Sequence, residues 1–212
     1  MAINLVKGEN INLSKEFGGE TKWRLGLSWD LPNNGGKEAD LDSFAFCLND
    51  RYENSGKIVS IDHMAAYFNA NGANKDKTTF TNEKGGLGFK SIDDCVKLLG
   101  DSRDGAEEGI DDEVIDIDLS KADPRTKSIL LAVNIYSPKG INFGMVKNSM
   151  CKLYKKDSDI PELCYELKED YSRFNCLVVA EIYQRNGEWK IQAIGDGKDD
   201  FEDFLREIGI PV

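Results

Sequence analysis

Acidic side chains crowd into one short stretch of the chain, residues 101–118, where their chemistry is that of a site for a hard cation. Nine carboxylates fall there against a single arginine: Asp101, Asp104, Glu107, Glu108, Asp111, Asp112, Glu113, Asp116 and Asp118. Carboxylates packed this closely repel one another unless a metal ion or protons neutralise them. Calcium is the natural candidate, because it accepts about six to eight oxygens in irregular geometry. A solvated acidic loop is the alternative interpretation.

A second acidic group comes earlier in the chain. Asp30 ends one expected strand, and Asp40 and Asp42 open the next. Residues two apart in a strand project from the same face, so Asp40 and Asp42 can present oxygens to one ion, with Asp30 as a third donor. Asp101, Asp104 and the run 111–113 would supply the remainder. The spacing is not that of an EF-hand, which needs ligands at positions 1, 3 and 5 and glycine at 6. The residues alone leave a calcium site and a plain acidic surface both open.

The thiols and the imidazole favour structural roles. Cys47, Cys95, Cys151, Cys164 and Cys176 are widely spaced and form no CxxC pair, which argues against a zinc ribbon, a thioredoxin-type motif or a disulfide scaffold. Their apolar neighbours predict buried thiols. The only histidine, His63, stands in a strand-like run and is expected to be structural rather than part of a nucleophilic triad.

Composition narrows the class of protein. The formal net charge of −11 argues against nucleic-acid binding, which needs clustered Lys and Arg. No apolar run approaches the length of a spanning helix, and the N-terminus lacks the features of a signal peptide, so the sequence predicts a cytoplasmic protein with no transmembrane segment of its own.

Period-two alternation is the dominant pattern and predicts an all-β fold: a β-sandwich of two mainly antiparallel sheets with a few short helices, in a single domain over 1–212. Expected strands cover 23–30, 44–48, 57–64, 115–119 and 129–133. Residues 176–184 and 188–194 flank Asn186-Gly187, which predicts a hairpin with a type I′ turn. Apolar spacing predicts helices over 91–99 and 201–208, and 71–91 is expected to be a loop.

Motifs along nearly the whole chain resemble those of the TerD-like tellurium-resistance and stress-response family. The first half carries Gly26-Leu27-Ser28-Trp29-Asp30, Asp40-Leu41-Asp42-Ser43-Phe44-Ala45-Phe46, Tyr67-Phe68-Asn69 and Gly100-Asp101-Ser102-Arg103-Asp104-Gly105 leading to Asp111-Asp112-Glu113. The second half carries Asn142-Phe143-Gly144-Met145-Val146, Cys164-Tyr165-Glu166-Leu167 and Glu181-Ile182-Tyr183-Gln184-Arg185-Asn186-Gly187-Glu188-Trp189-Lys190. The resemblance rests on the order of these motifs along the chain rather than on any single motif.

The resemblance implies a calcium-binding β-sandwich without enzymatic activity. It implies metal ligands at Asp30, Asp40, Asp42, Asp101, Asp111, Asp112 and Glu113, with Asn69 as a carbonyl donor. It also implies protein partners in a stress-response complex, one of them at a membrane. The chain departs from the family pattern at Ser102, over 105–111 and in an expanded loop at 71–99, which leaves open how many calcium sites are retained.

Two alternative functions remain. The first is a small-ligand protein that binds cyclic nucleotides, for which the candidate cations are Lys84, Lys90, Lys152, Lys155 and Lys156. The second is a metal-dependent hydrolase that uses the same carboxylates, although no nucleophile motif accompanies them.

Overall fold

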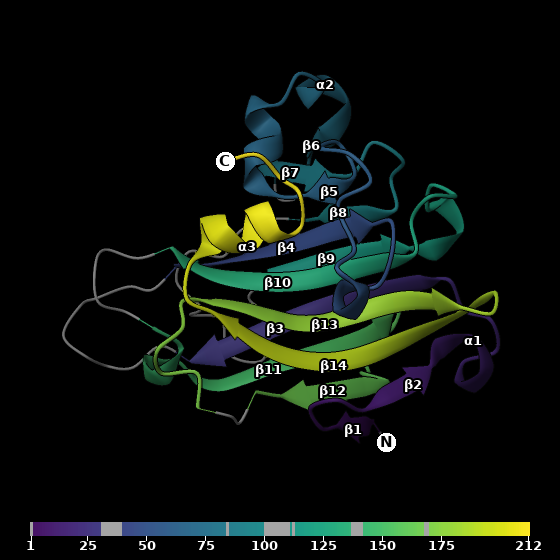
Figure 1. Cartoon of the computed structure of the whole chain (residues 1–212). Coiled ribbons are helices and arrows are strands. Elements are labelled where there is room, and N and C mark those ends of the chain that lie inside the picture. Colours follow the sequence, from purple (N-terminus) through teal and green to yellow (C-terminus); the bar gives the residue numbers. More distant parts are fainter. Residues whose placement is uncertain are drawn as a thin grey trace.

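The chain folds into two β-sheets packed face to face, with short helices at the periphery (Figure 1). The structure is a computed structural model. It describes residues 2–30, 40–83, 85–99, 111, 113–136, 142–167 and 170–212. The side chains of Asp30 and Asp40 and the whole of Asp101 and Asp112 lie outside the described part, so the structure does not test these four predicted ligands. The fold class is the sandwich that the sequence predicted.

One sheet has eight strands, and its order places β3 and β9 at the centre. From edge to edge it runs β1 (Ile3–Leu5), β12 (Leu163–Glu166), β11 (Lys147–Lys155), β3 (Lys22–Asp30), β9 (Glu113–Asp118), β8 (Val96–Leu98), β7 (Leu87–Lys90) and β6 (Thr79–Thr81). Among the strand pairs described, only β1 with β12 is parallel.

The other sheet has six strands. Its order is β2 (Asn10–Asn12), β14 (Glu188–Lys198), β13 (Cys176–Arg185), β10 (Ser128–Tyr136), β4 (Asp40–Leu48) and β5 (Met64–Ala65), with antiparallel pairing throughout. The helices are α1 (Leu13–Glu16), α2 (Lys75–Thr78) and α3 (Phe201–Glu207), and the 3₁₀ turns are η1 (Tyr52–Asn54), η2 (Tyr67–Asn71), η3 (Leu119–Lys121) and η4 (Phe143–Met145). No helix within the described ranges has the length and apolar character needed to cross a bilayer.

The main core lies between the sheets, and alternation along the strands builds it. Trp23, Leu25 and Leu27 of β3 point inward and are at most 4% exposed. Strand β10 is buried on both faces, as its continuous apolar run predicted: Ile129 and Leu131 enter the main core, whereas Leu130 enters a second cluster on the outside of the six-stranded sheet.

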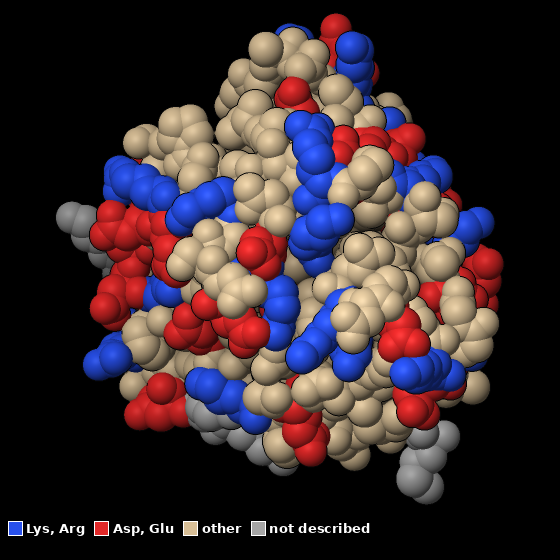
Figure 2. Space-filling model, turned by 45° about the vertical axis from the view of Figure 1, so that its right-hand side comes forward, with Lys and Arg blue, Asp and Glu red and all other residues tan. Residues whose placement is uncertain are grey.

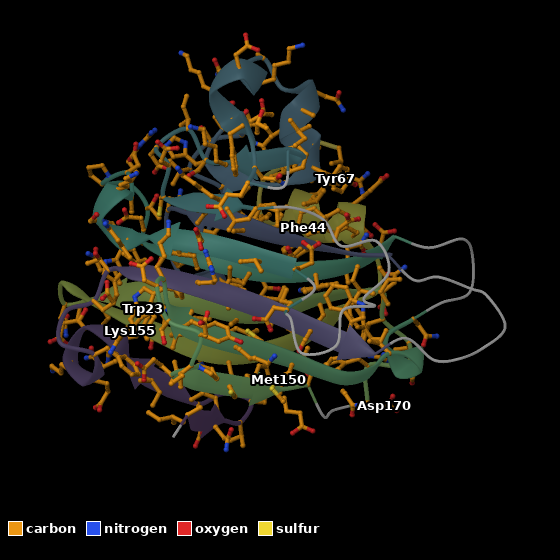
Figure 3. The ribbon with its side chains drawn as sticks, turned by 180° about the vertical axis from the view of Figure 1, so that it is seen from behind. Trp23, Phe44, Tyr67, Met150, Lys155 and Asp170 are labelled. Atoms are coloured by element: carbon orange, nitrogen blue, oxygen red, sulfur yellow. The ribbon has the colours of Figure 1, made fainter. Side chains whose placement is uncertain are left out.

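Helix α3 closes this second cluster. In Figure 1 the helix lies across the outer face of the six-stranded sheet, beside β4. Phe204 packs edge-on against Phe46 with ring centroids 5.9 Å apart, and Phe201 contacts Phe44 at 4.8 Å. Tyr67 of η2 also contacts Phe44, with ring centroids 5.7 Å apart, and Figure 3 shows these two labelled residues close together. The predicted C-terminal helix is therefore confirmed.

The hairpin predicted near the C-terminus is also confirmed. Strands β13 and β14 pair from Cys176–Lys198 to Arg185–Glu188 around the turn. Asn186 has φ 56° and Gly187 has φ 77°. Two consecutive positive φ angles define a type I′ turn, whose twist matches that of the strands it joins.

The helix predicted over 91–99 is wrong. Residues 91–95 form a turn in which Asp94 has φ 59°, a left-handed conformation that no helix accommodates. The Ser91 hydroxyl accepts the Val96 N–H at 3.1 Å, and the Asp93 carboxylate accepts the Cys95 N–H at 3.1 Å. These side chains offer the backbone an alternative to helical hydrogen bonds. Val96 and Leu98 are then buried on β8 against β9.

Two neighbouring predictions need correction as well. The strand predicted over 57–64 reduces to a single bridge between Ile58 and Leu48 followed by β5, because a turn closes from the His63 N–H to the Ser60 carbonyl. The loop predicted over 71–91 contains α2, β6 and β7 instead. The segment 71–99 therefore adds strands β6, β7 and β8 to the edge of the eight-stranded sheet.

Candidate metal site at one end of the sandwich

The two acidic segments meet at one end of the sandwich, where a buried hydrogen bond joins them. Ser43 on β4 and Glu113 on β9 belong to different sheets, yet the Ser43 hydroxyl donates to Glu113 Oε2 at 2.6 Å. Ser43 is 1% exposed and Glu113 2%. Ser43 is adjacent to Asp42 and Glu113 to Asp112, so the sequence groups 40–42 and 111–113 share an end of the molecule.

The strand directions bring further chain segments to the same end. Strand β3 ends at Asp30, β4 begins at Asp40, and the backbone of Asp40 pairs with Tyr136 at the end of β10. Lys147, the first residue of β11, pairs with Asp30. Backbone pairing thus brings the ends of β3 and β10 and the starts of β4 and β11 to the end of the sandwich where Glu113 begins β9.

Asp42 and Glu113 occupy different layers at this end. Glu113 shares the inward face of β9 with Ile115 and Ile117, so its carboxylate lies between the sheets. Asp42 shares the outer face of β4 with Phe44 and stands beside Asn134 of β10. A single ion bound by both would have to sit at the rim of the sandwich, where the two layers end.

Asp111 lies on the outer face of the eight-stranded sheet. Its Oδ1 accepts from the Lys152 ammonium at 2.8 Å, and its carboxylate sits where a Cβ on Gly26 would stand. Burial and a hydrogen bond to Asp111 raise the pKa of the Tyr154 phenol. The structure therefore directs Asp111 and Glu113 to opposite sides of the same sheet, although only one residue separates them.

Asn69 is committed to the backbone of its own turn. Its Oδ1 accepts the Ala66 N–H at 2.9 Å, and its amide donates to the Met64 carbonyl at 3.3 Å. The side chain is 3% exposed in η2, beyond β5. These bonds give Asn69 a structural role that the sequence did not predict.

The donor chemistry fits a hard cation, but the described side chains alone do not complete a site. Every predicted ligand offers oxygen, the donor that calcium prefers. Within the described ranges, however, no three carboxylate, thiol or imidazole side chains gather around one point. Asp42 and Glu113 are the described carboxylates at the rim, and they would hold calcium together with ligands from 30–40 and 101–112.

The lysines proposed for an anionic ligand are engaged elsewhere. Lys90 pairs with Asp94, Lys152 with Asp111, and Lys156 with Asp116 at 2.8–3.1 Å. Lys155 pairs with Glu162 at 3.1 Å, and Lys84 lies outside the described residues. On the face shown in Figure 2, basic and acidic side chains are intermixed, with no large basic region. These observations do not favour the nucleotide-binding alternative.

A cavity of about 380 Å³ lies on the outer face of the eight-stranded sheet, at the end opposite the acidic loops. Four lysines and four aspartates line it in equal number: Lys22, Lys97, Lys121, Lys156, Asp94, Asp116, Asp118 and Asp157. Asp116 accepts from both Arg24 at 2.9 Å and Lys156 at 3.1 Å. This balance gives the cavity no preference for an anion.

The surroundings of His63 and of the cysteine thiols indicate structural roles for these side chains. His63 is 5% exposed, with Nδ1 at 2.7 Å from the Ser60 hydroxyl and Nε2 at 3.4 Å from Asp123. Asp123 is held chiefly by Arg125, which contacts both carboxylate oxygens at 2.9 Å. All five cysteines are free, and four of them are buried. Burial raises the pKa of Cys151 to about 12, which suppresses its thiolate and hence its reactivity.

The fold defines the class of protein: a two-sheet β-sandwich in which the strand ends next to the two acidic stretches of the sequence meet at one end. The sequence model of the TerD domain matches residues 1–207, and the chain belongs to that family. It is 31% identical over 200 residues to general stress protein 16U of Bacillus subtilis (strain 168), covering 93% of this chain and 91% of that protein.

A second relative supports the same family, and a solved structure supports the fold. The chain is 30% identical over 199 residues to tellurium resistance protein TerD of Serratia marcescens, covering 93% of this chain and 91% of that protein. A crystal structure of a homologue of telluride resistance protein (TerD) from Streptomyces coelicolor A3(2) superimposes with a TM-score of 0.64 at 19% identity, over 91% of this chain and all of the other. The chain is therefore a member of a tellurium-resistance and stress-response family whose relatives are named for resistance and stress.

Proposed function

We propose that this protein is a calcium-binding, non-enzymatic module of a stress-response assembly that confers resistance to tellurium compounds and related stress. It would act in the cytoplasm or, through a protein partner, at a membrane. The observation that carries the calcium proposal is the Ser43–Glu113 hydrogen bond, which brings the two acidic segments to one end of the sandwich. Family membership supports the stress-response role.

Calcium would act here by neutralising charge and ordering loops. In the sequence, residues 101–113 carry seven acidic side chains and one basic one, and Asp40 and Asp42 open β4 at the end of the sandwich where Glu113 begins β9. Bringing these carboxylates together without a counter-ion costs free energy. A bound ion would remove that cost and stabilise the folded chain by linkage.

Calorimetric titration of the full chain with calcium tests the proposal. Asp42→Asn keeps the size of the side chain but removes its charge, and Glu113→Gln keeps an acceptor for Ser43. We expect each to weaken calcium binding about tenfold, the equivalent of roughly 1.4 kcal/mol. The matched controls are Asp76→Asn on α2 and Glu16→Gln on α1, which are both exposed; α1 packs beside the start of β14, at the end of the sandwich opposite Asp42. No heat of binding at millimolar calcium would refute the proposal, as would equal weakening by the controls.

A further inference from the structure

Two thiols from opposite sheets meet in the main core. Cys47 lies on the inward face of β4, and Cys95 ends the turn that precedes β8. Both residues are 0% exposed, and their thiols are hydrogen-bonded to each other, with one S–H donating to the other sulfur. Strands β4 and β8 lie side by side in Figure 1 but belong to different sheets. The thiol contact therefore bridges the two layers of the sandwich.

The strand register independently places these two thiols at the same level. The Ser43–Glu113 hydrogen bond aligns β4 with β9 where both strands begin. Four residues further along each strand come Cys47 and Ile117. Ile117 pairs with the first residue of β8, which directly follows Cys95. The contact thus follows from strand pairing among the described residues.

Backbone hydrogen bonds hold both cysteines in place. The Cys47 N–H donates to the His63 carbonyl at 2.9 Å, and the Cys95 carbonyl accepts the Asp118 N–H at 2.7 Å. The hydrogen bond with Cys95 and burial both raise the pKa of the Cys47 thiol well above its usual range. Because a protonated thiol is a poor nucleophile, Cys47 stays reduced at neutral pH unless an oxidant is present for a long time.

The other three cysteines are arranged differently. Cys151 pairs with Tyr165 on β12 and points into the main core, whereas Cys164 is one residue out of step and points to the opposite face of the same sheet. Cys176 lies in the second cluster, outside the six-stranded sheet. Facing thiols are therefore a particular feature of the first pair, and Cys151 provides a matched control.

We propose that Cys47 and Cys95 are oxidised by peroxide to an intramolecular disulfide that joins the two sheets. The inference does not depend on calcium binding. Cys95 directly follows residues 92–94, which are partly exposed, so a small uncharged peroxide has only this turn to pass.

The oxidation consumes one peroxide and produces two waters. The sulfur of one cysteine attacks a peroxide oxygen, so that an S–O bond forms, the O–O bond breaks, and hydroxide leaves with the thiol proton as water. The sulfur of the other cysteine then attacks the sulfenic acid. An S–S bond forms, the S–O bond breaks, and hydroxide leaves with the second thiol proton. The two sulfurs lose two electrons in total, and the peroxide gains them.

The disulfide would close a loop over residues 47–95, which includes β5, η2, α2, β6 and β7. A bond across a loop of this size restricts the unfolded chain and so stabilises the folded one. Reduced and oxidised protein should therefore differ in thermal stability, which gives a readout besides the bond itself.

The experiment treats the full chain, first reduced and held in chelator, with millimolar hydrogen peroxide for several hours. After the free thiols are alkylated and the protein is digested without reductant, mass spectrometry should find the Cys47 and Cys95 peptides joined and two hydrogen atoms lighter. We expect the oxidised chain to melt about 5 °C or more above the reduced chain, and dithiothreitol to reverse the shift. Cys151→Ala should show the same rise, whereas Cys95→Ala should show none.

The peptide measurement on the unmodified chain needs no variant, so it decides the matter even if Cys95→Ala does not fold. Oxidation of these thiols to sulfinic acids without a joined peptide would show that the inference is wrong. So would a bond that joins two chains, seen as a dimer in non-reducing electrophoresis. A rise in melting temperature of the same size in folded Cys95→Ala would also overturn it, since the stabilisation would then come from another oxidation.

Discussion

Individual carboxylates at the acidic end have different surroundings, although they are close in sequence. Glu113 is enclosed between the sheets and bonded to Ser43, whereas Asp111 lies on the outer face and is paired with Lys152. Spacing along the chain predicted one shared role for both. The sequence does not reveal that the two side chains lie on opposite sides of the sheet, and Gly26 makes room for the Asp111 carboxylate.

Buried thiols make the free energy of unfolding depend on pH in the alkaline range. Burial is the main cause that raises the pKa of Cys151 and Cys176 to about 12. In the unfolded chain such thiols ionise near pH 8.5. Above that pH the unfolded state loses protons that the folded state keeps, so the free energy of unfolding must fall as pH rises.

We expect these two thiols to lower the free energy of unfolding by roughly 3 kcal/mol between pH 8.5 and 10. Urea denaturation in the presence of a reducing agent measures it. In Cys151→Ala, which has a lower starting stability, the loss across the same pH interval should be smaller than in the unmodified chain by about 1.5 kcal/mol, the contribution of one thiol. A free energy of unfolding that stays constant over this interval would contradict the prediction.

At the scale of elements, local patterns predicted the structure where alternation, a continuous apolar run or a turn dipeptide determines the conformation by itself. The alternation in β3, the apolar run in β10 and the Asn186-Gly187 turn were all predicted correctly, because each depends on nearest neighbours in the chain. The helix predicted over 91–99 failed because its apolar spacing also fits a turn followed by β8, and pairing with β9 decided between them. The sequence predicted α3 but could not place it over β4.

The aromatic contacts that hold α3 against the six-stranded sheet contribute to the free energy of unfolding, and their contribution can be measured. Phe204 is 1% exposed and packs against Phe46 and Phe201. We expect Phe204→Ala to lower the free energy of unfolding by about 3–5 kcal/mol, because it removes a buried ring and leaves a cavity. Urea denaturation gives the value, and Glu202→Ala on the exposed side of α3 is the control. A loss below about 1 kcal/mol would show that the helix is not packed as described.

Across the whole molecule, charge is distributed unevenly. The formal net charge is −11, and residues 101–118 account for −8 of it. The candidate site could be anticipated from this concentration of charge, and the strand order explains why the segments 40–42 and 111–113 reach the same end. Which carboxylates converge depends on loop paths that no local pattern encodes, and for this reason the ligand set stays a prediction.

Calcium should stabilise the whole fold measurably if it binds at this end. With calcium at one hundred times its dissociation constant, linkage contributes about 2.7 kcal/mol. For a chain of 212 residues this corresponds to a rise in melting temperature of roughly 5–10 °C relative to protein in chelator. Scanning calorimetry measures the shift, with magnesium as the control because it accepts irregular sites less readily. Equal melting temperatures in calcium and chelator would count against a bound ion.

Strand β3 contains two tryptophans, and the intrinsic fluorescence of one of them can report on the acidic end. Trp29 is 5% exposed and directly precedes Asp30 at the acidic end, whereas Trp23, labelled in Figure 3, is fully buried near the opposite end of the strand, roughly 20 Å away. An ion that arrives beside Asp30 changes the electric field at one indole and hardly at the other. Intrinsic fluorescence can therefore follow events at that edge of the protein without any attached dye, with Trp23 and Trp189, the latter at the start of β14, providing a steady background.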